Sequence, residues 1–256
     1  MSSIRQTIES KGSNILNIYF TAGHPTLESV PVIISELEKA GADLIELGMP
    51  YSDPLADGPA IQRSSEIALR NGQTIAILFS QVKEARKTSS IPLILMGYYN
   101  QLIQYGEEKF VKEAHDAGIQ GLIIPDLPME VYESRYKDIF DKYGMEISFL
   151  ITPMTSDERI RQADRLSSAF IYVVSKSSVT GKQEDLSEEQ LSYLDRIRAM
   201  DLKSPALVGF GIFARNSRQA VNRFFNGVIV GSAFIRALEA GQDDLPGTVR
   251  VFMEGL

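Results

Sequence analysis

Glu46 is the first residue whose position suggests chemistry. In the β-rich run DLIELG, residues 43–48, side chains alternate, so Leu44, Glu46 and Gly48 share one face. If this strand belongs to a barrel, its outer face packs against a dry layer of helices, where an unpaired carboxylate is costly. The inner face opens to substrate at the C-terminal end of the barrel. We therefore expect Glu46 to point inward, either as an acid/base residue or as a structural acid paired with an interior Lys or Arg.

The loop after this strand carries two further carboxylates, Asp53 and Asp57. It reads MPYSDPLADGP, residues 49–59, and its three prolines stiffen the backbone that holds them. Asp-Pro and Asp-Gly are also common turn signals, so each aspartate taken alone could be a turn former. Directly above Glu46, however, a stiff loop with a carboxylate is suited to hold that group over a substrate.

Glycine-rich stretches late in the chain predict a phosphate site. GFGIFA, residues 209–214, matches half of a dinucleotide fingerprint, but the acidic residue that should follow it is missing. GSA, residues 231–233, follows another β-rich run, with Ser232 placed to start a helix. Loops after the last two strands of a barrel often bind phosphate through backbone N–H groups. The alternative that Gly209 and Gly211 only permit tight turns stays open.

Eight β-rich runs recur between helical stretches along the chain. They are residues 15–20, 43–48, 92–99, 121–126, 146–152, 169–175, 206–211 and 227–232. Strict alternation of strands and helices predicts a parallel sheet. Eight strands favour a closed (β/α)8 barrel over an open doubly wound sheet, which usually has fewer strands and a cofactor fingerprint near its start.

The segments between these runs have the amphipathic character and length of crossover helices. Clear examples are residues 27–40, 107–117, 130–143 and 191–200. Residues 1–12 predict an extra helix before the first strand, and residues 61–88 are long enough for two helices. Because no linker or charge block divides the chain, we predict an α/β fold with a single (β/α)8 TIM-barrel domain over residues 1–256 and an extra N-terminal helix.

The charge balance argues against nucleic acid and membranes as partners. The chain has 26 Lys and Arg against 33 Asp and Glu, a net charge of -7, which is the wrong sign for binding phosphate backbones or anionic lipid. No apolar run reaches the roughly 18 residues of a membrane span. A small phosphorylated substrate remains compatible with this charge, because backbone N–H groups can bind one phosphate.

The absence of cysteine excludes disulfides, thiolate catalysis and Cys-based metal sites. His24 and His115 are the only histidines, and we expect both to be surface or turn residues. We therefore predict no metal site. The N-terminal residues 1–14 lack the apolar segment of a signal peptide, so a cytoplasmic location is expected.

Residues 44–59, LIELGMPYSDPLADGP, resemble the signature of the tryptophan synthase α subunit family. Further matches are YFTAGHP at 19–25, LMGYYN at 95–100, GLIIPDLP at 121–128 and SVTG at 178–181, so the resemblance covers nearly the full length. It implies a TIM-barrel lyase that cleaves indole-3-glycerol phosphate into indole and glyceraldehyde 3-phosphate in tryptophan biosynthesis.

The resemblance also implies roles for the two carboxylates. Glu46 is expected to move protons at indole C3 and at the glycerol hydroxyl, and Asp57 to accept a hydrogen bond from the indole N–H. These residue types fit the chemistry, because positive charge builds on the ring nitrogen when C3 is protonated and a carboxylate opposes it. Proton transfer by Glu46 further requires that burial raise its pKa toward neutrality.

The remaining site residues are also carried over from the resemblance. It places Tyr19, Tyr98 and Tyr172 along the substrate cavity, although a strand tyrosine is more often simply packed. Thr180 matches the threonine of a loop that closes over the site and contacts the catalytic aspartate. The residues matched to phosphate contacts are Gly181, Gly211, Gly231 and Ser232.

The family resemblance implies no metal and no cofactor for this chain. Pyridoxal phosphate is expected only on a β subunit partner, with which α subunits form an α2β2 heterotetramer. Two alternatives stay open: a stand-alone lyase that releases indole, and a barrel without catalysis that only activates a β partner. The sequence departs from the family pattern at Ser178, where many relatives have Gly, and at His24, where Asp or Tyr is expected.

Overall fold

A computed structural model describes residues 3–55, 57–175, 187–209, 218 and 221–256. All strands in this part of the chain belong to one parallel sheet, and they match the eight predicted runs. They are β1 (Ile15–Thr21), β2 (Leu44–Gly48), β3 (Leu93–Met96), β4 (Gly121–Ile123), β5 (Glu146–Ile147), β6 (Leu150–Ile151), β7 (Ile171–Val174), β8 (Ala206–Gly209) and β9 (Gly227–Val230).

The fifth predicted strand is divided into two short pieces, β5 and β6. β5 pairs with β4, β6 pairs with β7, and the order of the sheet runs from β5 through β1 to β6. Between the pieces, side-chain hydroxyls replace strand partners: Phe149 N donates to Ser167 Oγ at 3.2 Å and Phe170 N donates to Ser148 Oγ at 3.3 Å. Because β5 and β6 stand at the two ends of this strand order but follow one another directly in the chain, the sheet closes into the predicted barrel.

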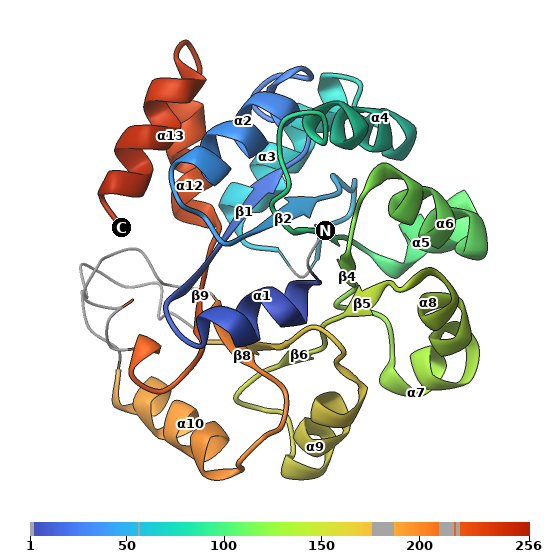
Figure 1. The fold of residues 1–256 in the computed structure, drawn as a ribbon, viewed down its shortest axis with the longest axis vertical. Helices are drawn as coiled ribbons and strands as arrows, with labels where there is room; N and C mark the ends of the chain where they lie inside the picture. The colour runs from blue at the N-terminus through green and yellow to red at the C-terminus, as the bar shows by residue number, and fades with distance from the viewer. Residues whose placement is uncertain (1–2, 56, 176–186, 210–217, 219–220) are drawn as a thin grey trace.

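Helices surround this barrel, as Figure 1 shows. They are α1 (Ile4–Lys11), α2 (Ser29–Lys39), α3 (Pro59–Arg70), α4 (Ile75–Ala85), α5 (Tyr99–Tyr105), α6 (Glu107–Ala117), α7 (Met129–Val131), α8 (Lys137–Tyr143), α9 (Asp157–Leu166), α10 (Glu188–Ala199), α12 (Ser232–Ala240) and α13 (Leu245–Glu254). The helix predicted at 130–143 contains a π-helical turn, η1 (Tyr132–Tyr136). The segment predicted to hold two helices contains α3 and α4.

The extra N-terminal helix α1 closes one end of the barrel. Its Ile4 and Ile8 are fully buried and belong to the apolar cluster that fills the interior, together with Ile15, Leu44 and Ile94. In Figure 1, α1 lies across the centre of the ring of strands. Since α1 packs at the N-terminal ends of the strands, substrate can reach the interior only from the C-terminal ends.

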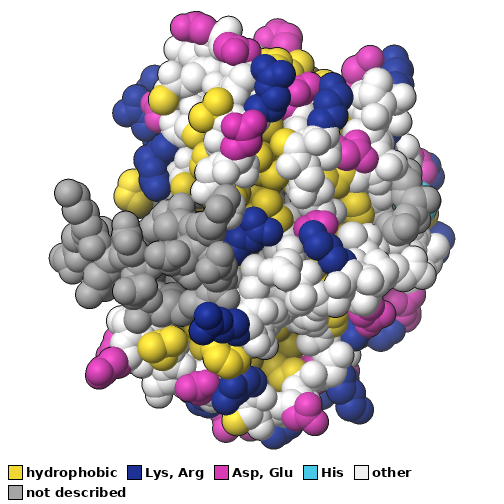
Figure 2. All heavy atoms as spheres, turned by 60° about the vertical axis from the view of Figure 1, so that its left-hand side comes forward, with side chains coloured by type: hydrophobic (Ala, Val, Ile, Leu, Met, Phe, Trp, Pro, Cys, Tyr) yellow, Lys and Arg dark blue, Asp and Glu magenta, His cyan; other side chains and the backbone are white. Residues whose placement is uncertain are grey.

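The outer surface is ordinary for a globular protein. On the face shown in Figure 2, Lys and Arg side chains are interspersed with Asp and Glu. Within the described ranges, no helix is both long and apolar enough to cross a bilayer. A second and larger apolar cluster fills the layer between the sheet and the surrounding helices.

Candidate active site

Glu46 lies in the middle of β2 and points into the barrel, as the alternation predicted. It stands opposite Tyr19 of β1 and Ile94 of β3, and its side chain is fully buried. Asn17 Nδ2 donates a hydrogen bond to Glu46 Oε1 at 2.6 Å. Among the described residues Oε2 has no hydrogen-bond partner. The hydrogen-bond partner of this carboxyl is therefore an amide, and the alternative of a structural acid paired with Lys or Arg finds no support in the described chain.

The environment of Glu46 shifts its titration toward neutrality. Burial raises the pKa of Glu46 to about 8, and the hydrogen bond from Asn17 lowers it by a smaller amount. Desolvation dominates because no cation in the described part of the chain offsets the cost of the buried charge. Glu46 is therefore largely protonated near pH 7 and can give up and regain a proton, as an acid/base residue must.

Asp57 approaches the site from the loop between β2 and α3. Tyr98 Oη donates a hydrogen bond to Asp57 Oδ2 at 3.0 Å, and Gln62 Nε2 donates to the carbonyl oxygen of Asp57 at 2.8 Å. Burial raises the pKa of Asp57 to about 6, while the hydrogen bond from Tyr98 lowers it. The other loop carboxylate, Asp53, is exposed and accepts a hydrogen bond from Ser52, which fits a turn former.

Three tyrosines meet these carboxylates. Tyr19 and Tyr172 are buried side chains of β1 and β7, and both their pKa values are raised by burial and by the negative charges of Glu46 and Asp57. Tyr98 is the N-cap residue of α5 and stacks on Tyr51, with ring centroids 5.0 Å apart. The structure thus brings five of the predicted site residues together at the C-terminal end of the barrel, and Tyr19 and Tyr172 remain neutral hydroxyls.

Two glycines at strand ends make room for these tyrosines. A Cβ added at Gly48 would lie 2.1 Å from Tyr19 Oη, and one at Gly209 would lie 2.4 Å from Tyr172 Oη. Real Cβ atoms never approach a neighbour so closely, so any larger residue would displace the phenol. The sequence left open that Gly209 only permits a tight turn. The structure gives a steric reason for glycine at this position, the close approach of Tyr172.

Helix α12 starts at Ser232, as predicted, and supplies part of a possible anion site. Its N-cap residue is Gly231, and no side chain caps the first turn. The N–H groups of a first turn have no partner within the helix and favour an anion. A Cβ at Gly231 would lie 3.3 Å from the Tyr19 ring, so this turn adjoins the site. The other predicted contacts, Thr180, Gly181 and Gly211, lie outside the described residues, as does Ser178.

Comparison with known proteins agrees with this geometry. The sequence profile of the family described as "Tryptophan synthase alpha chain" matches residues 6–253. The chain belongs to this family. The tryptophan synthase alpha chain of Flavobacterium johnsoniae is 52% identical over 238 residues, which cover 93% of this chain and 94% of that protein.

Solved structures of the tryptophan synthase family share the fold. The crystal structure of the alpha chain from Legionella pneumophila superimposes with a TM-score of 0.88 at 32% identity and covers 100% of this chain and 95% of that chain. A tryptophan synthase structure from M. tuberculosis, in its aminoacrylate-bound form, superimposes with a TM-score of 0.83 at 28% identity over 99% of each chain. The TIM barrel inferred from strand order is thereby confirmed.

The two histidines were expected to be surface or turn residues. His24 does lie in the turn after β1, but its side chain is only 1% exposed, so it is a turn residue and not a surface residue. The turn is covered by α3, whose C-cap residue Asn71 donates to the carbonyl oxygens of Gly23 and Pro25, both at 2.9 Å. His115 is exposed, as expected. The described residues contain no cluster of three or more metal-ligating side chains.

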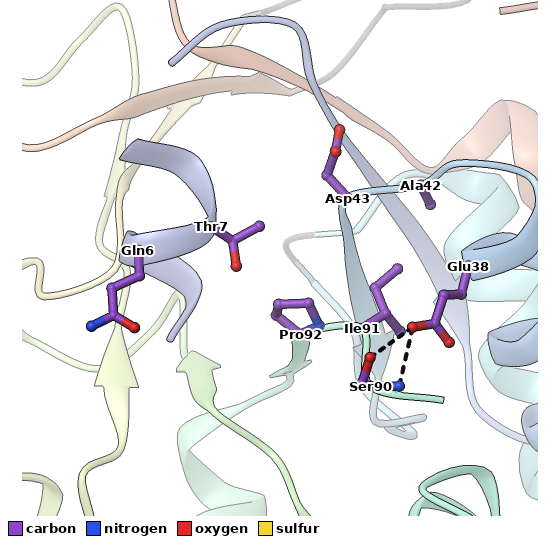
Figure 3. Close-up of a pocket in the computed structure, with 8 residues that line it drawn as sticks. All are labelled: Gln6, Thr7, Glu38, Ala42, Asp43, Ser90, Ile91 and Pro92. Carbon is purple, nitrogen blue, oxygen red and sulfur yellow. Dashed lines mark hydrogen bonds between the residues drawn. The ribbon is translucent and has the colours of Figure 1, made fainter. Parts of the chain in front are cut away.

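A surface pocket at the opposite end of the barrel is separate from the α-chain site. Figure 3 shows that it lies between α1 and the segments that lead into β2 and β3. Its carboxylates already have structural partners: Ser90 N and Oγ both donate to Glu38 Oε1 at 3.1 Å, and Lys11 pairs with Asp43 at 2.7 Å. The first contact joins α2 to the segment before β3, and the second joins α1 to the segment before β2, so both carboxylates of this pocket have structural partners.

Asn17 is the residue of this α-chain site that sequence reasoning missed. Alternation along β1 places Ile15, Asn17 and Tyr19 on one face, so an inward amide could have been predicted from the same pattern that placed Glu46. Its contact with Glu46, however, depends on the pairing of β1 with β2, in which Asn17 stands opposite Leu44.

Proposed function

We propose that Glu46 and Asp57 catalyse in this chain the α reaction of tryptophan synthase, the cleavage of indole-3-glycerol phosphate to indole and glyceraldehyde 3-phosphate. As a member of the family, the chain is a lyase subunit of tryptophan biosynthesis. The observation that carries the residue assignment is the pair of carboxyls with raised pKa values at the open end of the barrel, one deep on β2 and one above it on the loop.

The reaction follows from the protonation states of these groups. Protonated Glu46 donates its proton to C3 of the indole ring, which places positive charge on the ring nitrogen. The ionised carboxylate of Asp57, held by Tyr98, accepts a hydrogen bond from the ring N–H and opposes that charge. Glu46, now ionised, takes the proton of the glycerol hydroxyl, the C–C bond breaks, and its electrons restore the aromatic ring. The products are indole and an aldehyde.

The substrate phosphate is assigned to the first turn of α12. Gly231 and Ser232 supply the backbone approach there, and Gly181 and Gly211 complete the proposed set by resemblance. Tyr19 and Tyr172 form the wall of the cavity, and Thr180 is assigned to the loop that closes over it. The direct test of this function is an assay of the purified chain with indole-3-glycerol phosphate, in which indole and glyceraldehyde 3-phosphate appear in equal amounts.

The pH dependence of kcat/KM should be a bell with its maximum near neutrality. Asp57 must be ionised, so activity should fall as the pH drops through its pKa of about 6. Glu46 must begin protonated, so activity should fall as the pH rises through its pKa of about 8. The profile of kcat/KM reports groups of the free enzyme. A value of kcat/KM that stays constant from pH 5 to pH 9, roughly one unit beyond each of the two pKa values, would contradict the proposed roles of both carboxyls.

We further propose that the chain works with a β subunit in an α2β2 complex, and that the α chain itself needs no cofactor while pyridoxal phosphate belongs to the partner. The loop that carries Asp57 supports the proposed binding of a β subunit. Its tip residue Leu55 is 93% exposed, so an apolar side chain at the tip of this loop is accessible to a partner that covers the loop. A partner that covers this loop would also fix the position of Asp57. The proposed compartment is the cytoplasm.

A β subunit should accelerate indole release by roughly one to two orders of magnitude, because it shifts the loop toward its active arrangement. The measurement is turnover of the α chain alone and with a purified β subunit, and co-purification with a pyridoxal phosphate protein identifies the partner. Leu55→Ser is the matched variant, since it should weaken activation while leaving turnover of the isolated chain nearly unchanged. Equal turnover with and without the β subunit would favour the stand-alone lyase, and a chain inactive in both states would favour the purely activating barrel.

A further inference from the structure

Asn17 occupies a position where an apolar residue would be expected. It faces the barrel interior, is 0% exposed, and its strand neighbours in register are Leu44 and Ile229, both in the apolar interior cluster. Its Oδ1 has no hydrogen-bond partner among the described residues. An incompletely paired amide costs stability in such a layer, so packing alone does not account for it.

The contact that Asn17 does make is with Glu46. Its Nδ2 lies 2.6 Å from Oε1, and both side chains are fully buried. This hydrogen bond fixes one oxygen of the carboxyl on the side toward the N-terminal end of the barrel, where Asn17 precedes Tyr19 on β1. The other oxygen, Oε2, has no partner in the described structure and stays available for proton transfer.

We propose that Asn17 is a positioning residue for the acid/base carboxyl: its amide holds Glu46 Oε1 and thereby presents Oε2 to the substrate in both protonation states. This inference rests on the proposed role of Glu46. Among the described residues, the titratable side chains that interact with the charge of Glu46 are Tyr19 and Tyr172, and neither is cationic; the same two tyrosines also interact with Asp57. Asn17 is thus the donor that favours the ionised form of Glu46.

An amide suits this role better than a cation does. Lys or Arg beside Glu46 would hold it ionised and prevent it from acting as the acid at C3. The amide donates through Nδ2 to Oε1, and Oε1 can accept this hydrogen bond whether Oε2 is ionised or protonated. Asn17 therefore moderates the effect of burial without fixing the charge state, which keeps the proton transferable in both directions.

The decisive experiment titrates the Glu46 carboxyl directly. In free enzyme labelled with ¹³C at glutamate side chains, the Glu46 signal is assigned by its loss in Glu46→Gln. We expect Asn17→Leu, which keeps the size but removes the donor, to raise the pKa of Glu46 by about one unit. The high-pH limb of kcat/KM should move upward by the same amount, and kcat at pH 7 should fall about ten-fold with little change in KM.

Asn17→Asp is the second variant, because it keeps the shape of the side chain. Two carboxyls at this distance cannot both ionise easily, so the apparent pKa of the pair should rise further than in Asn17→Leu. Ile229→Ala is the matched control: it truncates the neighbour of Asn17 in the same layer and should lower the melting temperature without moving the Glu46 titration.

An unchanged Glu46 titration in both Asn17 variants would overturn the proposal, whatever happens to activity, because a purely structural amide would affect only stability. If Asn17→Leu fails to fold, the titration of Asn17→Asp decides. The titration needs no substrate, so it is independent of the proposed function. Normal turnover in Glu46→Gln would refute the role of Glu46 in catalysis, while the ¹³C titration would still show whether Asn17 governs that carboxyl.

Discussion

Replacing Glu46 with Gln should lower kcat for indole release at least about 10²-fold while leaving the fold intact. The amide has the same shape as the acid, and it can still accept the hydrogen bond from Asn17 Nδ2 through its oxygen. It cannot give a proton to C3 or take one from the glycerol hydroxyl. Substrate contacts elsewhere in the site are unchanged, so KM should change far less than kcat.

Glu146→Gln is the matched control for this substitution. Glu146 begins β5 at the opposite end of the barrel, where it accepts a hydrogen bond from the backbone N of Arg5 at 3.2 Å. Its pKa is also raised by burial, so the control tests whether any partly buried strand glutamate affects turnover. We expect a modest change in stability and normal kcat. Near-normal turnover in Glu46→Gln would remove Glu46 from the mechanism.

The alternation of side chains made much of this site predictable. A single inward carboxylate and a stiff loop that follows it were sufficient to place Glu46 and Asp57 at one end of a barrel, because parallel strands all end on the same side. The eight strands were predictable because β-rich runs recur between amphipathic segments along the chain. The break between β5 and β6 was not predictable, since there the hydroxyls of Ser148 and Ser167 accept from the backbone N–H groups of Phe170 and Phe149, contacts that form only in the folded chain.

Contacts between distant segments account for what the sequence did not predict. His24 is buried in a turn whose backbone on either side of it is held by Asn71, at the far end of α3. The steric need for glycine at position 48 arises from Tyr19, which lies on the adjacent strand. Such relations depend on strand register, which the sequence of one strand does not contain.

The second large effect is expected at Asp57. Asp57→Asn should lower kcat about 10²-fold, the loss typical of removing one preorganised electrostatic contact to a developing charge. The asparagine keeps the shape of the side chain but carries no negative charge to oppose the positive charge on the ring nitrogen. Because this charge develops only as C3 is protonated, the loss should appear in kcat more than in KM.

Two control variants separate this role from the structure of the loop. Asp53→Asn changes an exposed carboxylate of the same loop and should leave turnover of the isolated chain unchanged. The hydrogen bond from Tyr98 to Asp57 Oδ2 lowers the pKa of Asp57. Tyr98→Phe removes this bond, so the pKa should rise and the low-pH limb of kcat/KM should move above about 6. Activity at pH 7 should then fall by a smaller factor than in Asp57→Asn and recover as the pH rises, because the carboxylate is retained. If Asp57→Asn matched Asp53→Asn in turnover, the charge at the ring nitrogen would have to be opposed by another group.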